Sequence, residues 1–183
     1  LWDAINDPMW GAFIDSRKPT KYGKFRPYIF WFSIPLAVSA VLMFTVIPNL
    51  SSAKYLLFAY ITYIFYGMMY TAVNIPYGSL ASVITDDEKV RSSLSMWRSI
   101  GAGIGGLPGT VLLPMFVYTT TGTYANGTSI KALDGHKLTM FVAVLAVLSV
   151  VIFFFHFKLT KERIAPIEKK KGDYSAFKAI GDL

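Results

Sequence analysis

The stretch LTMFVAVLAVLSVVIFFFHF, residues 138–157, contains no charged side chain. A helix of about 20 residues, rising 1.5 Å per residue, is long enough to cross the hydrocarbon of a bilayer. Three further uncharged runs, at residues 28–49, 55–85 and 99–129, are at least as long. The 183 residues are 54% hydrophobic and 16% charged, whereas soluble domains carry about 25% charged residues. These features predict an all-α, polytopic membrane protein.

The uncharged runs divide the chain into segments. We expect residues 1–14 to be the second half of a transmembrane helix, and full helices over residues 28–47, 55–84, 93–118 and 138–157. Residues 1–157 are then one transmembrane bundle of about five helices, followed by a basic loop at 158–183 with a short amphipathic segment. Because the chain opens without Met inside an apolar stretch, we expect it to be a fragment of a longer protein.

The distribution of positive charge predicts the orientation. Of the 18 Lys and Arg residues, 14 fall in the segments 15–27, 85–92 and 158–183, which lie on one side if the helices alternate. Loops on the cytoplasmic side of a membrane protein attract Lys and Arg. We therefore assign these segments to the cytoplasm, and the net charge of +7 gives no reason to expect a nucleic-acid partner.

The composition excludes several kinds of site. The chain has no Cys, so it can form neither a disulfide nor a zinc–thiolate site. Its two His residues, His136 and His156, are far apart, and we expect His156 to lie at the membrane interface. No Ser–His–Asp or metal-ligand cluster occurs, so we predict no enzyme, no catalytic residue and no cofactor.

Three ionisable residues, Asp3, Asp7 and Arg98, fall inside the apolar segments. A charge at membrane depth costs roughly 2.5–3.5 kcal/mol, so each of these residues indicates a function. Asp3 and Asp7 are one helical turn apart and share a helix face, beside Asn6. Helix geometry puts them about 10–16 Å from the inner end, near the bilayer midplane.

The helix expected at residues 55–84 carries a polar stripe at spacings of three and four: Tyr63, Tyr66, Tyr70, Asn74 and Tyr77, with Thr71 alongside. Carboxylate, amide and hydroxyl oxygens suit a small cation, whereas tyrosine rings and an arginine suit a sugar. Two alternatives remain open. Asp3 and Asp7 could form a structural ion pair with Arg98, and the tyrosine stripe could serve helix packing.

Four motifs carry a resemblance to a known family. They are WDAINDP at residues 2–8, GAFIDSR at 11–17, YGKFRP at 22–27 and GMMYTAVNIPY at 67–77. In this order they resemble the glycoside–pentoside–hexuronide:cation symporters, the melibiose permease family of the major facilitator superfamily. The resemblance implies that the chain holds helices II to VI of the N-terminal six-helix bundle and the start of the central loop.

The resemblance also implies roles for residues. The cation-binding set is Asp3, Asn6, Asp7, Thr71 and Asn74, the substrate-binding set is Asp3, Tyr70, Asn74 and Arg98, and the cytoplasmic gate is Gly11, Asp15 and Arg17. The implied activity is symport of a sugar with Na⁺ or H⁺ by alternating access, in a bacterial inner membrane. Apart from Na⁺ at Asp3 and Asp7, no metal is expected. The partners are a small sugar or glycoside and membrane lipid, and the protein is expected to be a monomer.

Two positions depart from the melibiose permease pattern. Asn74 stands where those proteins have Asp, and Gly78 stands where they have Trp. We therefore expect a different glycoside, such as a xyloside, pentoside or glucuronide, and a wider cavity. The alternatives are a major facilitator lysolipid transporter and a non-transporting membrane sensor or anchor, whose basic tail at residues 169–171 would bind a partner or anionic lipid.

Overall fold

The computed structural model describes residues 2–124 and 129–164, except for the side chains of residues 2 and 3. The helices are α1 (Trp2–Ser16), α2 (Arg26–Met43), α3 (Ser52–Ile84), α4 (Glu88–Leu107), α5 (Leu113–Val117) and α6 (Gly135–Leu159). A π-helical turn, η1 (Pro108–Leu112), joins α4 to α5, and two strands, β1 (Tyr118–Thr123) and β2 (Ser129–Leu133), precede α6. The amphipathic segment expected at 174–183 and the basic tail at 169–171 lie outside the described residues.

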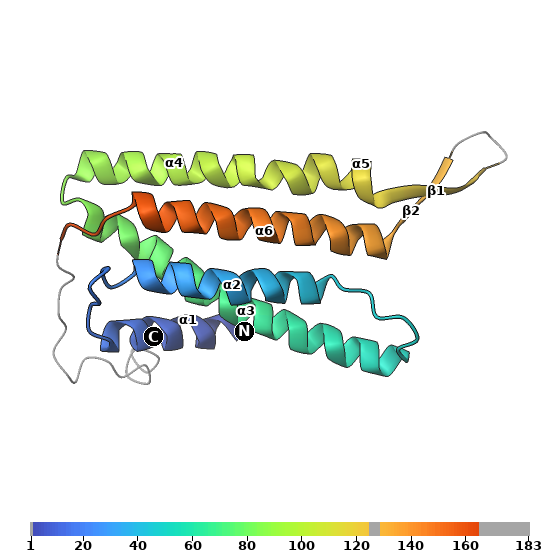
Figure 1. Ribbon diagram of the computed structural model, residues 1–183, viewed down its shortest axis with the longest axis horizontal. Helices are drawn as coiled ribbons and strands as arrows, with labels where there is room; N and C mark the ends of the chain where they lie inside the picture. Colours follow the sequence, from blue (N-terminus) through green and yellow to red (C-terminus); the bar gives the residue numbers. More distant parts are fainter. Residues whose placement is uncertain (1, 125–128, 165–183) are drawn as a thin grey trace.

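The helices form elongated rods that run along a common long axis (Figure 1). α2 packs against both α3 and α6, and α1 packs against α3. The rod formed by α4, η1 and α5 meets α3 through α4 and meets α6 through α5. Four rods among the described residues are long and apolar enough to cross a membrane: α2, α3, α4 with its extension to Val117, and α6. The predicted polytopic helical fold is confirmed.

All four long helices begin earlier than the uncharged runs predict, α2 at Arg26 and not at 28, and α3 at Ser52 and not at 55; α2 also ends at Met43 and not at 47. For α4 and α6 an acidic cap explains the difference. α4 begins at Glu88 and not at 93, because the Asp87 carboxylate accepts a hydrogen bond from the backbone N–H of Lys89 at 2.8 Å. α6 begins at Gly135 and not at 138, because Asp134 accepts bonds from the first backbone N–H groups in the same way. An acidic N-cap stabilises a helix end that hydropathy leaves out.

The segment expected to be a polar loop at residues 119–137 also contains regular structure. β1 and β2 pair antiparallel, with Tyr118 opposite Leu133 and Thr123 opposite Ser129. Threonine favours extended backbone because its Cβ is branched. A pair of strands therefore extends from one end of the otherwise helical fold, between α5 and α6 (Figure 1).

The buried core lies where α1, α2 and α3 meet near the expected cytoplasmic end. Its centre consists of Ile14, Phe25, Ile29, Val73, Leu80 and Val83. By contrast, α4 has no buried residue. α3 is therefore the element that links the packed part of the bundle to the sparsely packed α4.

Candidate functional site

The first part of the site lies between α1 and α3. The hydroxyl of Thr71 donates a hydrogen bond to Oδ1 of Asp7, with Oγ1 and Oδ1 3.1 Å apart. Thr71 is buried, whereas Asp7 is exposed. This bond joins two residues of the predicted cation-binding set that are 64 positions apart in the sequence.

The other members of the predicted cation set are placed differently. Asn6 is 2% exposed, and its Nδ2 has no hydrogen-bond partner among the described residues. Asn6 borders a small pocket lined by apolar side chains of α1 and α3: Met9, Trp10, Phe13 and Met68. Asp3 lies in α1 one turn before Asp7, and its side chain is outside the described part.

The second part of the site lies between α3 and α4. Nη2 of Arg98 donates to Oδ1 of Asn74 at 3.3 Å. The guanidinium carbon of Arg98 also lies 4.9 Å from the centre of the Tyr77 ring, which is a cation–π arrangement. Arg98 forms no ion pair with Asp7 in the described part of the chain, so the structural ion-pair alternative is wrong for that carboxylate.

The predicted site is thus divided between two sides of α3. Thr71 is turned to α1, whereas Asn74 and Tyr77 are turned to α4. Asn74, predicted for both the cation and the substrate, lies with the substrate group. Successive helical residues are 100° apart, so positions 71 and 74 point about 60° apart.

A cavity of about 700 Å³ opens beside the second group. Its wall includes Tyr70, Asn74, Tyr77, Gly78, Trp97, Arg98 and His156. Small-molecule sites typically measure about 300–1,000 Å³. A Cβ on Gly78 would lie 3.6 Å from Nη1 of Arg98, so the glycine leaves the space next to the guanidinium open.

Sequence reasoning missed two residues of this wall. His156, expected at the membrane interface, was not assigned to a site; it lies in the cavity wall with its ring centre 5.5 Å from that of Tyr77. Trp97, one position before Arg98 in the sequence, also lines this cavity. Two features of the sequence could have pointed to these residues. His156 is a polar ring inside an otherwise uncharged run, and Trp97 is an aromatic ring next to Arg98, a charge inside an apolar segment.

The predicted cytoplasmic gate lies at the end of α1. Nζ of Lys24 is 3.3 Å from Oδ1 of Asp15 and 3.4 Å from its carbonyl oxygen. The Lys24 side chain is 8% exposed and that of Asp15 is 37% exposed, so the ammonium group is shielded while the carboxylate still reaches water. The guanidinium of Arg17 lies over the Phe13 ring, at 4.9 Å, and a Cβ on Gly11 would meet nothing within 4 Å.

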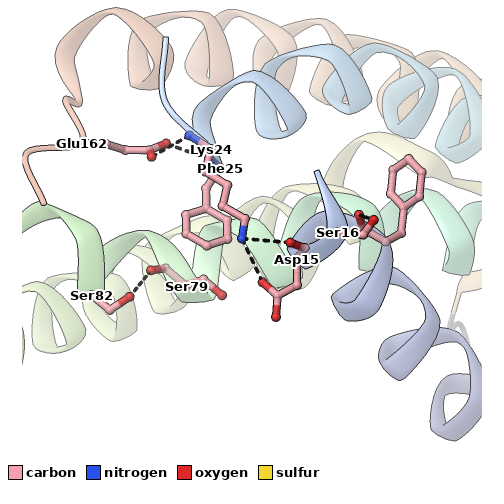
Figure 2. A network of polar contacts seen from close by, with 8 residues as sticks. Asp15, Ser16, Lys24, Phe25, Ser79, Ser82 and Glu162 are labelled. Carbon is pink, nitrogen blue, oxygen red and sulfur yellow. Dashed lines mark hydrogen bonds and ion pairs between the residues drawn. The ribbon is translucent and has the colours of Figure 1, made fainter. Parts of the chain in front are cut away.

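A carboxylate from the far end of the chain joins this region. Glu162, just after α6, accepts hydrogen bonds from the backbone N–H groups of Lys24, Phe25 and Arg26 at 2.7, 2.8 and 2.9 Å. Figure 2 shows the Glu162 carboxylate beside Lys24 and Phe25. The first N–H groups of a helix have no partner within the helix, and an anion there is stabilised. The next two residues donate backbone bonds to the carbonyl of Val83 in α3, at 2.8 and 3.0 Å. The segment after α6 therefore fastens the start of α2 to the end of α3.

The whole chain, residues 1–183, matches the family described as MFS/sugar transport protein. The isoprimeverose transporter of Lactiplantibacillus pentosus is 39% identical over 170 residues, which cover 92% of this chain and 33% of that protein. The glucuronide carrier protein homolog of Escherichia coli K12 is 33% identical over 171 residues, with coverages of 91% and 34%. The sodium-dependent lysophosphatidylcholine symporter 1 of Gallus gallus is 32% identical over 114 residues, with coverages of 61% and 21%. The chain spans about a third of the length of the first two relatives.

Proposed function

The chain belongs to the MFS/sugar transport protein family, and we propose from that premise that it forms part of a symporter that moves a sugar or glycoside together with a cation. It is an integral, multi-pass membrane protein, and the relatives are named as transporters, a carrier and a symporter, not as enzymes. Because it spans a third of the relatives' length, the activity proposed is that of the whole protein, in a bacterial inner membrane.

The observation that carries this proposal is the cavity beside Asn74, Tyr77 and Arg98. A sugar presents hydroxyl groups that both donate and accept hydrogen bonds, together with apolar ring faces. The amide of Asn74 and the guanidinium of Arg98 match the hydroxyls. The exposed ring of Tyr70, in the same wall, matches a sugar face.

The cation site is proposed around Asp7 and Thr71. Their hydrogen bond brings a carboxylate and a hydroxyl oxygen together, and Asp3 adds a second carboxylate one helical turn earlier. Two carboxylates repel each other when both are ionised at one site, so Na⁺ or H⁺ binding lowers the free energy of any conformation that holds them together. Asn6 supports this region from the core, where its amide nitrogen has no protein partner among the described residues.

Coupling is proposed to run through α3. Thr71 belongs to the cation group and Asn74 to the sugar group, so a shift of α3 alters both sites at once. By thermodynamic linkage, the cation and the sugar then raise each other's affinity by the same factor. Two helix bundles rocking about a midplane site would expose it to each side in turn, with the Asp15–Lys24 pair at the cytoplasmic gate.

The test uses the full-length transporter in proteoliposomes, with labelled isoprimeverose and a labelled phenyl glucuronide as substrates. We expect uphill accumulation of one of them, driven by a Na⁺ or a pH gradient. Asp3→Ala and Asp7→Ala should each abolish accumulation and keep part of the downhill flux, whereas the exposed control Asp86→Ala should transport normally. Normal accumulation by both Asp3→Ala and Asp7→Ala would refute the coupling assignment.

A lysolipid transporter is the second candidate, favoured by the similarity to the lysophosphatidylcholine symporter. The polar groups of Asn74 and Arg98 in the cavity wall favour the sugar. Uptake of labelled lysophosphatidylcholine, measured in the same vesicles and not competed by sugars, would favour the lipid.

A further inference from the structure

His156 is the one described residue of α6 in the wall of the main cavity. It also borders a second, more apolar cavity of about 280 Å³, whose wall shares Tyr70, Asn74 and Tyr77 with the first. His156 therefore lies where the two cavities adjoin. From this position, α6 contributes a polar ring to a space otherwise formed by α3, α4 and Thr160, the residue after α6.

The His156 ring also contacts the aromatic part of the site. Its centre lies 5.5 Å from that of Tyr77, with the two ring planes tilted by 56°, and the same Tyr77 ring lies under the guanidinium of Arg98. Tyr77 thus has an imidazole and a guanidinium as neighbours. A substitution at His156 can therefore affect the position of Arg98 through the Tyr77 ring, which contacts both side chains.

The nitrogens of His156 are not used by the described part of the protein. Nδ1 is buried and has no hydrogen-bond partner there. A buried nitrogen is out of reach of a ligand, so Nε2 is the nitrogen that this ring can offer to the two cavities it borders. A ligand hydroxyl in the cavity would bond an imidazole nitrogen, which donates or accepts according to its tautomer.

We propose that His156 is a substrate-binding residue, whose Nε2 hydrogen-bonds one hydroxyl of the sugar held by Asn74 and Arg98 and whose ring positions Tyr77. The inference rests on the proposed function, because it concerns the same cavity. It adds a specificity element to that site. A sugar that lacks the hydroxyl facing His156 binds more weakly than one that has it.

Two substitutions separate the roles of the ring and of its nitrogen. His156→Gln places an amide near the position of Nε2 without the ring, whereas His156→Phe keeps a ring and removes both nitrogens. The matched control is His136→Phe, since His136 is exposed at the other end of α6 and lines neither cavity. All are made in the full-length transporter, and sugar affinity is measured in vesicles with whichever labelled sugar the wild type accumulates.

We expect His156→Phe to weaken sugar binding on the order of tenfold, as loss of one buried hydrogen bond does. His156→Gln should recover most of that loss, and His136→Phe should bind as the wild type does. Competition by a series of monodeoxy analogues provides the second readout. One analogue should bind the wild type on the order of tenfold more weakly than the parent sugar and bind His156→Phe as well as the parent does.

Unchanged affinity and an unchanged analogue profile in His156→Phe would overturn the inference while leaving sugar symport intact. A wild type that accumulates neither sugar would overturn the proposed function, and this inference with it. If His156→Phe does not reach the membrane, carbethoxylation of the wild-type histidines, mapped by mass spectrometry, replaces it. Saturating sugar should slow modification of His156 several-fold and leave that of His136 unchanged, and equal rates with and without sugar would refute the assignment.

Discussion

The carboxylate of Glu162 fills the space beside Gly23. A Cβ built on Gly23 would lie 2.5 Å from Oε1 and 2.7 Å from Oε2 of Glu162, and Gly23 has a φ of +108°, which L side chains rarely adopt. Without a side chain at position 23, the carboxylate approaches the first backbone N–H groups of α2. Gly23 and Glu162 thus jointly determine how α2 begins.

Gly23→Ala is expected to destabilise the transporter by about 1–3 kcal/mol, because alanine must adopt a positive φ and displaces the Glu162 carboxylate. The measurement is thermal unfolding of the purified full-length protein in detergent. Gly103→Ala in α4 is the control, since a Cβ there meets nothing within 4 Å and alanine favours a helix. Equal unfolding temperatures for wild type and Gly23→Ala would contradict the prediction.

Glu162→Ala removes the acceptor of three backbone hydrogen bonds. We expect a loss of about 2–4 kcal/mol, because bonds to a charged group contribute more than neutral ones. Glu162→Gln keeps an acceptor oxygen and loses the charge, so it should lie between Ala and wild type in unfolding temperature. If the Gln and Ala variants unfold at the same temperature, the hydrogen bonds are not what Glu162 contributes to stability.

Thr71→Val removes the hydroxyl that donates to Asp7 and keeps the shape of the side chain. On the proposed function, the cation concentration that half-saturates sugar uptake should rise on the order of tenfold, because a ligand oxygen is lost and a carboxylate loses its partner. Thr71→Ser retains the hydroxyl and should stay near wild type. The assignment fails if Val and Ser variants show the same cation dependence as the wild type.

Gly78 is next to Arg98 in the wall of the main cavity. Gly78→Ala should preserve transport, because its Cβ would lie at an ordinary contact distance of 3.6 Å from the guanidinium, and it should raise stability by about 0.5–1 kcal/mol. Gly78→Trp places a large ring in the cavity, and on the proposed function uptake of whichever labelled sugar the wild type accumulates should fall sharply. Full uptake by the Trp variant would show that the substrate does not occupy this space.

The long helices could be predicted because the bilayer imposes a length on charge-free segments. The end of α3 at Ile84 could be predicted as well. The starts of α4 and α6 could not, since Asp87 and Asp134 begin these helices inside segments that hydropathy assigns to loops. The β1–β2 hairpin depends on pairing between strands, which no hydropathy pattern reports.

The candidate site was predictable in its residue types and less so in its arrangement. Polar residues at spacings of three and four on α3 indicated a functional face. Only packing decides that Thr71 meets α1 while Asn74 meets α4. His156 and Glu162 act across more than 75 and 130 positions of the chain, a distance at which no local motif carries information.

On the proposed function, a single helix that carries both halves of the site limits the ways in which transport can fail. If α3 moves as one body between Thr71 and Asn74, the sugar and the ion must cross together. Moving one without the other would require the helix to bend between these two residues, which are less than one turn apart. Slippage, in which one solute leaks without the other, would then be opposed by the stiffness of ordinary helical hydrogen bonds. A fixed stoichiometry would follow from backbone mechanics as much as from the chemistry of the ligands.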